Sequence, residues 1–326
     1  MNLLITGGAG FIGSNLIHFL VNRLEIQRIV NLDCLTYAGN PDNLKGLEGT
    51  AKYVFERVDL RDKDAVLRVV SQHAVSHVMH LAAESHVDRS ITGPGDFIHT
   101  NIVGTFHLLE ACRSAWAGKA GPFKFHHVST DEVYGSLGPT GLFTETTPYA
   151  PNSPYSASKA SSDMLVRAYH HTYGLPSVIT NCSNNYGPFQ YPEKLIPVVI
   201  QSLLARKPIP IYGDGMNVRD WLYVRDHVEA LWRVLQAGSL GETYNIGGNN
   251  EWPNIRIVEL ICDLVDEFKP ELGGSSRKLM TFVKDRPGHD RRYAIDASKL
   301  AKELGWSPSY TFEKGIRETG TSFHRK

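Results

Sequence analysis

Cysteine is scarce in this sequence, and its spacing is not that of a metal site. The four cysteines, Cys34, Cys112, Cys182 and Cys262, lie far apart, and no two of them form a Cys-x-x-Cys motif. This pattern argues against both a disulfide framework and a zinc site. We therefore expect four reduced cysteines that serve in packing, and no bound metal.

The sequence also lacks an excess of charge and a long apolar run. Lys and Arg together number 34, as do Asp and Glu, so the composition favours neither nucleic acid nor an anionic membrane as a partner. No segment approaches about eighteen consecutive apolar residues, and no basic stretch precedes the apolar residues at the amino terminus. We expect a cytoplasmic protein with no membrane partner and no nucleic-acid partner.

Apolar runs typical of strands alternate with helical patterns over the first 180 residues. The 326 residues, 42% of them hydrophobic, can bury a large core. Successive β-α units of this kind predict a Rossmann-type α/β fold, which is a doubly wound parallel sheet. The expected strands are 2–6, 29–33, 52–56, 75–80, 125–129 and 177–181, and the clearest helices are 62–72, 96–115 and 156–173.

A glycine-rich loop follows the first expected strand. In this G-x-x-G-x-x-G pattern, Gly7 permits a tight turn, Gly10 lets the backbone approach a pyrophosphate, and Gly13 allows close helix packing. The second strand ends in Asp33, where an acid binds a ribose 2′-hydroxyl and would repel a 2′-phosphate. The pattern predicts NAD rather than NADP. The alternative interpretation of Asp33 is a capping aspartate.

A hydroxyl, two carboxylates, a phenol and an ammonium come next along the chain. Thr130, Asp131 and Glu132 follow a strand, and Tyr155 and Lys159 are four residues apart, so they share a helix face. The ammonium favours a phenolate, but activity at neutrality needs a shift of roughly 3 units from a pKa of ~10. A nicotinamide cation would add the second positive charge. Adjacent carboxylates raise the pKa of one partner, which supplies an acid and a base.

The Tyr-x-x-x-Lys spacing occurs twice, so spacing alone does not identify the site. Tyr310 and Lys314 repeat it after the turn-like segment 306–309, with no hydroxyl and carboxylate cluster before them. We interpret that second pair as structural. For the Asp131-Glu132 pair, the structural alternative is a surface pair that caps the next segment.

The character of the sequence changes after residue 183, where Gly and Pro punctuate turns such as Tyr186-Gly187-Pro188. We expect a Rossmann NAD-binding domain over residues 1–183 and a mainly substrate-binding domain over 184–326. The two should interleave, because residues near 220–248 contain a helix at 225–236 and a strand at 243–246 that can return to the sheet. A further helix is expected at 255–268.

Six segments together resemble the extended short-chain dehydrogenase/reductase family, and within it the nucleotide-sugar 4,6-dehydratases. The resemblance extends to about Trp306, and its most specific element is Thr-Asp-Glu, because the similar 4-epimerases and decarboxylases do not offer this acid and base pair. The last twenty residues carry no recognisable motif. The six segments are Gly7 to Gly13, Leu81 to Asp88, Thr130 to Glu132, Tyr155 to Lys159, Asn184 to Pro188 and Arg286 to His289.

The resemblance implies a reaction on dTDP-glucose with NAD that gives dTDP-4-keto-6-deoxyglucose. Tyr155 would take the proton from the sugar O4, Thr130 would hydrogen-bond O4, and Lys159 would hold the phenolate and the nicotinamide ribose. Glu132 would remove the C5 proton and Asp131 would protonate the departing C6 hydroxyl, while hydride moves from C4 to C6. The resemblance also implies a homodimer formed through a four-helix bundle of residues 96–115 and 156–173.

The same resemblance implies two sets of binding residues. Asp59 would reach the adenine, although it could instead start a helix, and Arg219 and Arg286 would clamp the diphosphate with planar guanidinium groups unless they are solvated. The NAD site would include Gly7, Gly10, Phe11, Ile12, Gly13, Asp33, Leu35, Thr36, Asp59, Leu60, Ala82, Ala83, Ser85, Thr100, Tyr155, Lys159 and Asn185. The nucleotide-sugar site would include Ser85, Thr130, Asn184, Glu193, Lys194, Tyr212, Arg219, Asn254, Arg286 and His289.

Three other functions stay open at this point. A UDP-sugar 4-epimerase would use the same Tyr155, Lys159, Thr130 and NAD, and the Asp131-Glu132 pair argues against it. A 4,6-dehydratase of a UDP, GDP or CDP sugar differs only in contacts that the sequence does not place. A non-catalytic NAD-binding regulator should have lost Tyr155 or Lys159, and both are present.

Overall fold

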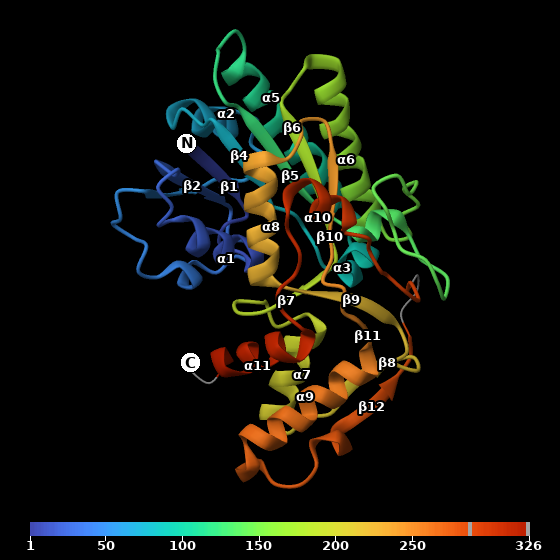
Figure 1. Cartoon of the computed structure of the whole chain (residues 1–326). Helices are drawn as coiled ribbons and strands as arrows, with labels where there is room; N and C mark the ends of the chain where they lie inside the picture. Colours follow the sequence, from blue (N-terminus) through green and yellow to red (C-terminus); the bar gives the residue numbers. More distant parts are fainter. Residues whose placement is uncertain (286–288, 324–326) are drawn as a thin grey trace.

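A seven-stranded parallel sheet forms the centre of the larger part of the molecule (Figure 1). The computed structural model describes residues 1–285 and 289–323. The sheet order is β10-β6-β5-β4-β1-β2-β3, which confirms the expected doubly wound α/β fold. The strands are β1 (Asn2–Thr6), β2 (Arg28–Asp33), β3 (Tyr53–Arg57), β4 (His77–His80), β5 (Lys124–Thr130), β6 (Ser177–Cys182) and β10 (Thr243–Ile246).

Helices cover both faces of this sheet, because successive strand residues point to opposite sides. In β1, Leu3 and Ile5 join one buried core, and Leu4 joins the other. The first core is covered by α1 (Phe11–Leu20), α8 (Val224–Ala237) and α10 (Ser298–Leu304), and the second by α2 (Lys63–Gln72), α5 (Thr105–Trp116) and α6 (Pro154–Tyr173) (Figure 1).

The chain reverses its direction across the sheet beside β1. Strands β2 and β3 follow on one side of β1, whereas β4, β5 and β6 follow on the other. The loops after β1 and β4 therefore diverge at the carboxyl ends of these strands, which is where open α/β sheets bind ligands. The Thr6 hydroxyl fixes this junction by accepting from the backbone N–H groups of Leu81 and Ala82 at 3.2 and 3.1 Å.

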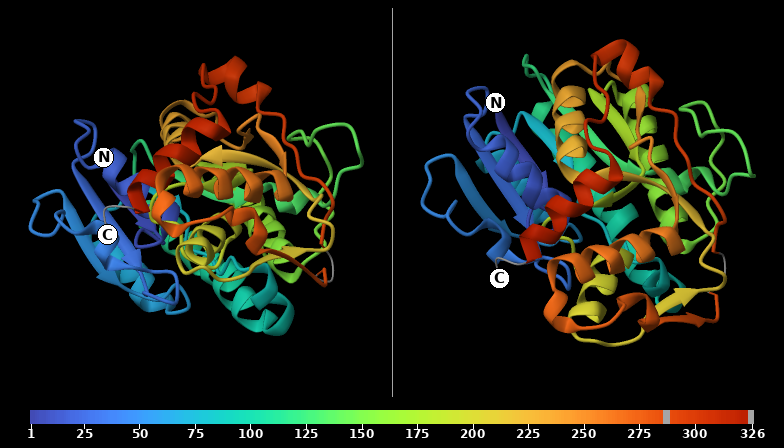
Figure 2. Two further views of the ribbon diagram at one scale, coloured as in Figure 1. Left: turned by 90° about the horizontal axis from the view of Figure 1, so that it is seen from below. Right: turned by 60° about the horizontal axis from the view of Figure 1, so that its bottom comes forward.

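A smaller part follows the carboxyl end of β6 (Figures 1 and 2). Its core packs around Tyr186, Trp221 and Phe312. Residues beyond 183 also supply α8, β10 and α10 to the large sheet, so the two parts share the chain. The smaller part contains a sheet of β11 (Glu251–Pro253), β9 (Val218–Tyr223) and β7 (Asn184–Tyr186), the pair β8 (Ile209–Tyr212) and β12 (Met280–Val283), and the helices α7 (Leu195–Leu204), α9 (Asn254–Phe268) and α11 (Phe312–Phe323).

The helix expected over 96–115 is not one regular α-helix. It consists of α4 (Pro94–Phe97), a π-helical segment η2 (Ile98–Gly104) and α5. The wider π turn coincides with two tight contacts. The buried Asn101 side chain bonds the backbone of Glu84 and the Ser158 hydroxyl, and a Cβ at Gly104 would lie 2.8 Å from Leu60 Cβ.

The remaining short helices connect these elements. They are α3 (Val87–Thr92), η1 (Pro41–Leu44), η3 (Asp131–Tyr134), η4 (Pro270–Leu272) and η5 (Ser276–Leu279). All four cysteines are free thiols. Within residues 1–285 and 289–323, no helix has the length and apolar character needed to cross a membrane, and no cluster of three or more His, Cys, Asp or Glu side chains could hold a metal ion.

Candidate active site

Thr130, Asp131 and Glu132 form a turn at the carboxyl end of β5. Thr130 ends the strand, and its hydroxyl caps η3 by accepting from the Glu132 N–H at 3.3 Å. The same hydroxyl lies 3.4 Å from Asp131 Oδ1. The turn leaves Asp131 1% exposed and Glu132 partly buried, so both carboxyl groups stand at the sheet edge predicted to bind ligand.

Helix α6 brings Tyr155 and Lys159 to the same edge. Ser153 begins the helix with a capping box, and Pro154 occupies its first position, where a missing N–H costs nothing. Both site residues are buried. Lys159 Nζ donates to the carbonyl of Val128 in β5 at 2.9 Å, which anchors the helix against the strand that carries Thr130.

Asp131 has the electrostatic environment of a proton donor. Burial raises the pKa of its carboxyl group well above the usual range, and Glu132 and Asp220 raise that pKa further, while Arg219 opposes them. Its Oδ2 atom is buried and has no hydrogen-bond partner in the described part of the chain. This shift favours the protonated form of Asp131, and its partner Glu132 is the more exposed of the two.

The Tyr155 phenol is not activated by Lys159 alone. Burial raises the pKa of Tyr155 well above its usual range, Glu132 raises it further, and the Thr130 hydroxyl opposes the shift. Burial also lowers the pKa of Lys159, and Asp163 opposes that shift. A phenolate here needs another positive charge, which the sequence predicts in the nicotinamide cation.

The glycine loop fits a pyrophosphate. Gly7 has a φ of +71°, and a Cβ there would lie 2.8 Å from the Ala82 backbone. A Cβ at Gly13 would lie 2.2 Å from the Gly7 carbonyl oxygen, whereas one at Gly10 would meet only that oxygen, at 3.3 Å. The loop is thus closed around Gly7 and Gly13 and has space beside Gly10, where a phosphate can approach the amino end of α1.

Asp33 fits a ribose at the other end of the same site. Its two carboxyl oxygens accept from the N–H groups of Ala9 at 3.0 Å and Leu35 at 2.8 Å. These bonds fix the carboxylate between the glycine loop and the chain after β2. A carboxylate has about four acceptor positions, so two are available for ribose hydroxyls.

Asp59 lies after β3 and is held by Arg61. The Arg61 side chain donates to both carboxyl oxygens of Asp59, with the shortest distance 2.6 Å. The segment 59–62 does lead into a helix, but its cap is Asp62, which precedes α2, and not Asp59. An adenine contact from Asp59 would share the carboxylate with this guanidinium group.

The other predicted cofactor residues lie on segments that leave the carboxyl ends of strands. They are Phe11 and Ile12 at the start of α1, Leu35 and Thr36 after β2, Leu60 after β3, Ala82, Ala83 and Ser85 after β4, Thr100 in η2, and Asn185 in β7. Sequence reasoning missed His227 of α8, which lies 2.8 Å from Asn185 Oδ1 through its Nδ1. Burial lowers the pKa of His227 to about 3, so a neutral ring orients the Asn185 amide.

Two of the predicted sugar-site residues connect the two parts of the molecule. Lys194 Nζ donates to the Ser85 carbonyl at 2.9 Å. Glu193 Oε2 lies 3.6 Å from the Arg89 guanidinium and 3.8 Å from His86 Nε2. The chain before α7 therefore packs against the segment after β4, which brings Glu193, Lys194 and Ser85 together.

Arg219 of β9 is buried, and its charge acts on Asp131. It donates to the carbonyls of Val218 and Asp290 at 2.8 Å each, lies over the Tyr293 ring at 4.2 Å, and lowers the pKa of Asp131. A guanidinium group at this position can bind a diphosphate and also lower the pKa of Asp131.

The remaining predicted sugar-site residues lie around the smaller part. Asn184 starts β7, and Asn254 starts α9 with a buried Oδ1 that has no partner among the described residues. The Tyr212 and His289 rings are 6.5 Å apart, and His289 Nδ1 lies 2.6 Å from Asp285 Oδ1. Arg286 lies outside the described residues.

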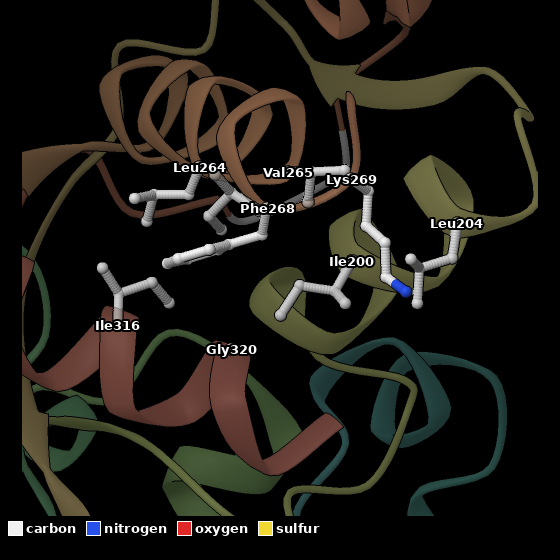
Figure 3. A pocket seen from close by; sticks show the side chains of 9 residues that line it. Ile200, Leu204, Leu264, Val265, Phe268, Lys269, Ile316 and Gly320 are labelled. Atoms are coloured by element: carbon white, nitrogen blue, oxygen red, sulfur yellow. The ribbon is translucent and has the colours of Figure 1, made fainter. Parts of the chain in front are cut away.

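The second Tyr-x-x-x-Lys pair is far from this chemistry. Lys314 Nζ lies 4.3 Å from the centre of the Tyr310 ring, and that ring packs against Tyr223 in the smaller part. An enclosed pocket between α7, α9 and α11 is also separate from the site, because only apolar side chains and Lys269 line it (Figure 3).

The fold and the arrangement of these residues define the class of extended short-chain dehydrogenase/reductases. The chain belongs to the GDP-mannose 4,6 dehydratase family, whose model matches residues 4–319. It is 60% identical over 321 residues to the dTDP-glucose 4,6-dehydratase of Xanthomonas campestris pv. campestris (strain B100), which covers 97% of this chain and 91% of that protein.

Two solved structures are similar to this chain in their fold. The dTDP-glucose 4,6-dehydratase of Bacillus anthracis in complex with NAD matches with a TM-score of 0.89 and 47% identity, over 100% of this chain and 97% of that one. A UDP-glucose 4-epimerase from Thermotoga maritima with UDP-glucose matches with a TM-score of 0.87 but 29% identity, over 100% and 99% of the two chains. The fold is common to both enzyme types, so the site must distinguish them.

Proposed function

We propose that this protein is a dTDP-glucose 4,6-dehydratase that uses NAD and produces dTDP-4-keto-6-deoxyglucose. One observation carries the proposal. Asp131 is a buried carboxyl group beside Glu132, its pKa is raised by burial and by that neighbour, and both groups also raise the pKa of Tyr155. A 4-epimerase needs only the Tyr155 part of this arrangement, whereas loss of water needs an acid and a base as well. The names of the similar proteins support the same assignment.

The first half of the reaction belongs to Tyr155 and Thr130. When bound, NAD supplies the acceptor and later the donor of the hydride that the sugar gives up at C4 and regains at C6. Tyr155 takes the proton from O4, and Thr130 hydrogen-bonds that oxygen, so the phenol and hydroxyl that already contact each other both face O4. Lys159 supplies positive charge behind the phenolate.

The second half belongs to Glu132 and Asp131. The C4 ketone makes the C5 proton acidic, Glu132 takes that proton, and Asp131 gives its own proton to the leaving C6 hydroxyl. One water leaves, and Asp131 is left ionised while Glu132 is left protonated. Glu132 then returns a proton to C5, and release of the O4 proton by Tyr155 balances the uptake of one proton by Asp131 before the next turnover. Each of these transfers is typically worth about 10²–10⁴-fold in rate.

The binding roles follow the positions of the side chains. The glycine loop would hold the NAD pyrophosphate and Asp33 the adenosine ribose, and Asn185, oriented by His227, would also bind the cofactor. On the substrate side, Glu193 and Lys194 lie at the junction with Ser85, and Arg219, whose charge lowers the pKa of Asp131, would bind the diphosphate. Residues 1–183 serve mainly NAD, and residues 184–326 serve mainly the nucleotide sugar.

The assembly we propose is a homodimer formed by a four-helix bundle. Large apolar side chains are exposed together on η2, α5 and α6, where Ile98 is 49%, Phe106 39% and Met164 50% exposed. Exposed large apolar side chains on neighbouring helices are typical of an association surface. The enzyme would work in the cytoplasm, in keeping with its four free thiols.

A panel of nucleotide sugars tests the function. Purified protein is incubated separately with dTDP-glucose, UDP-glucose, GDP-mannose and CDP-glucose, and the masses of the products are measured by mass spectrometry. The proposal predicts that dTDP-glucose loses one water fastest. The Tyr155→Phe protein is the control and should leave every sugar unchanged. A product of unchanged mass and inverted C4 from any of these sugars would establish an epimerase instead.

A further inference from the structure

A buried carboxyl group that the proposed mechanism does not use lies behind Lys159. Asp163 follows Lys159 by one turn of α6 and is 1% exposed. Residues four apart share a helix face. Two hydroxyl groups hold the Oδ2 atom of Asp163 in place, Ser129 Oγ donating at 2.9 Å and the Tyr149 hydroxyl at 3.0 Å. His127 Nε2 lies 3.1 Å from the Oδ1 atom, which has no hydrogen-bond partner among the described residues.

The titratable groups around Lys159 make Asp163 its counter-charge. His80 of β4 and His127 of β5 are neutral, because burial lowers the pKa of each well below the usual range. The approach of His127 Nε2 to Asp163 Oδ1 is therefore not an ion pair, and the hydrogen-bond partner of this nitrogen is Ser162 Oγ at 3.1 Å. Cys182 of β6 is also neutral, since burial raises the pKa of its thiol to about 12.

The neighbours of Asp163 favour its ionised form. The Asn181 amide donates to the Tyr149 hydroxyl at 3.1 Å, so that hydroxyl is free to donate its proton to Asp163. The Ser129 hydroxyl donates to the same oxygen. These donors and Lys159 oppose burial, and the net result is an Asp163 pKa of about 7. The carboxyl group is charged above neutral pH and loses its charge as the pH falls.

We propose that Asp163 is a positioning residue that keeps Lys159 protonated in the protein interior, so that Lys159 can stabilise the Tyr155 phenolate. This inference rests on the proposed function, in which Tyr155 is the base. A buried ammonium without a counter-charge would give up its proton. Asp163 lies one turn farther from Tyr155 than Lys159 does, so its own repulsion of the phenolate is weaker than the attraction it preserves.

The substitution Asp163→Asn tests the inference, because it keeps the shape and removes the charge. Tyrosinate formation in the NAD-loaded enzyme, without substrate, is followed by ultraviolet difference absorbance as the pH rises. The Tyr155→Phe enzyme identifies which part of the signal comes from Tyr155. In Asp163→Asn the Tyr155 midpoint should move to higher pH by at least about one unit, the usual effect of one nearby charge. The rate of the first turnover at neutral pH should fall about tenfold or more.

Two further variants separate this role from a merely structural one. Asp226→Asn removes another buried carboxylate, which accepts from the Ser309 hydroxyl at 2.7 Å and from the N–H groups of Ser309 and Tyr310 at 2.9 Å each. It should lower the melting temperature without moving the Tyr155 midpoint. Tyr149→Phe removes one donor to Asp163 and keeps the charge, so its midpoint should move in the same direction by less.

The outcomes are distinct. A Tyr155 midpoint that is the same in wild type, Tyr149→Phe and Asp163→Asn would overturn the inference, even if the variants are less stable. If Tyr155→Phe changes neither the titration signal nor turnover, Tyr155 is not the base, and the proposed function itself fails.

Discussion

Asp131 and Asp163 are both buried, and the pKa of each is raised by burial, but their neighbours give them opposite uses. Two further carboxylates, Glu132 and Asp220, raise the pKa of Asp131, which favours its protonated form and the role of a proton donor. Lys159 and two hydroxyl donors lower the pKa of Asp163 towards neutrality, so it can be a counter-charge. Burial alone therefore does not assign a role to a carboxyl group.

The neutral state of Asp131 predicts a cost in stability at higher pH. The pKa of Asp131 is raised in the folded protein. Its contribution to the free energy of unfolding is therefore fully present below the unfolded pKa of ~4 and is lost as the pH rises through the folded pKa. Asparagine does not ionise. The free energy of unfolding of Asp131→Asn should therefore exceed that of wild type by about 1 kcal/mol or more at a pH of about 8. At a pH of about 4 the two free energies should be equal. Urea unfolding at both pH values measures this, and an equal difference at both would contradict the assignment.

Among the secondary-structure elements, those with local signals could be predicted from the sequence. Apolar runs indicated the strands of the sheet, and α6 begins where Ser153 and Pro154 provide a cap. The π-helical η2 could not be predicted in this way. Its cause is the Asn101 side chain, whose partners Glu84 and Ser158 are distant in sequence. Local propensity within residues 96–115 does not contain that information.

The apolar face on η2, α5 and α6 predicts the effect of a single charge. Met164→Glu places a carboxylate in the middle of the proposed bundle and should convert the dimer to monomer, as measured by sedimentation. Leu24→Glu is the matched control, because Leu24 is 95% exposed away from these helices and should leave the dimer intact. A wild-type protein that is monomeric and active at micromolar concentration would remove the dimer proposal.

At the scale of the whole molecule, the sequence identified the parts of the site that lie in short motifs. The glycine loop, Thr130 to Glu132 and Tyr155 with Lys159 each occupy a few consecutive residues. His227 and Tyr149 carried no such signal, because their partners Asn185 and Asp163 lie on other elements and outside any short motif. Asp163 had a weak signal, because a carboxylate one helical turn after Lys159 can pair with it. Whether the two residues act as a charge pair depends on the burial of both groups, which the sequence does not show.

The connection between the two parts of the molecule predicts tight retention of NAD. The Arg89 guanidinium lies 3.8 Å from the centre of the Tyr37 ring, near the predicted cofactor residues, and 3.6 Å from Glu193. Purified protein should keep NAD through gel filtration and need none added, because the reaction has no net redox change. Arg89→Ala should lose NAD faster, whereas the control Arg113→Ala, which removes a surface pair on α5, should not. Release of one NADH with each product would contradict the closed cycle.

The central claim is that one molecule separates oxidation, by Tyr155, from loss of water, by Asp131 and Glu132. Single-turnover rapid mixing with dTDP-glucose tests this claim. Nicotinamide absorbance reports the oxidation, and mass spectrometry of quenched samples reports the loss of water. Glu132→Gln and Asp131→Asn should oxidise the sugar but lose water about 10²–10⁴-fold more slowly than wild type. Tyr155→Phe should do neither. If both carboxyl variants lose water at the wild-type rate, the dehydratase account is wrong.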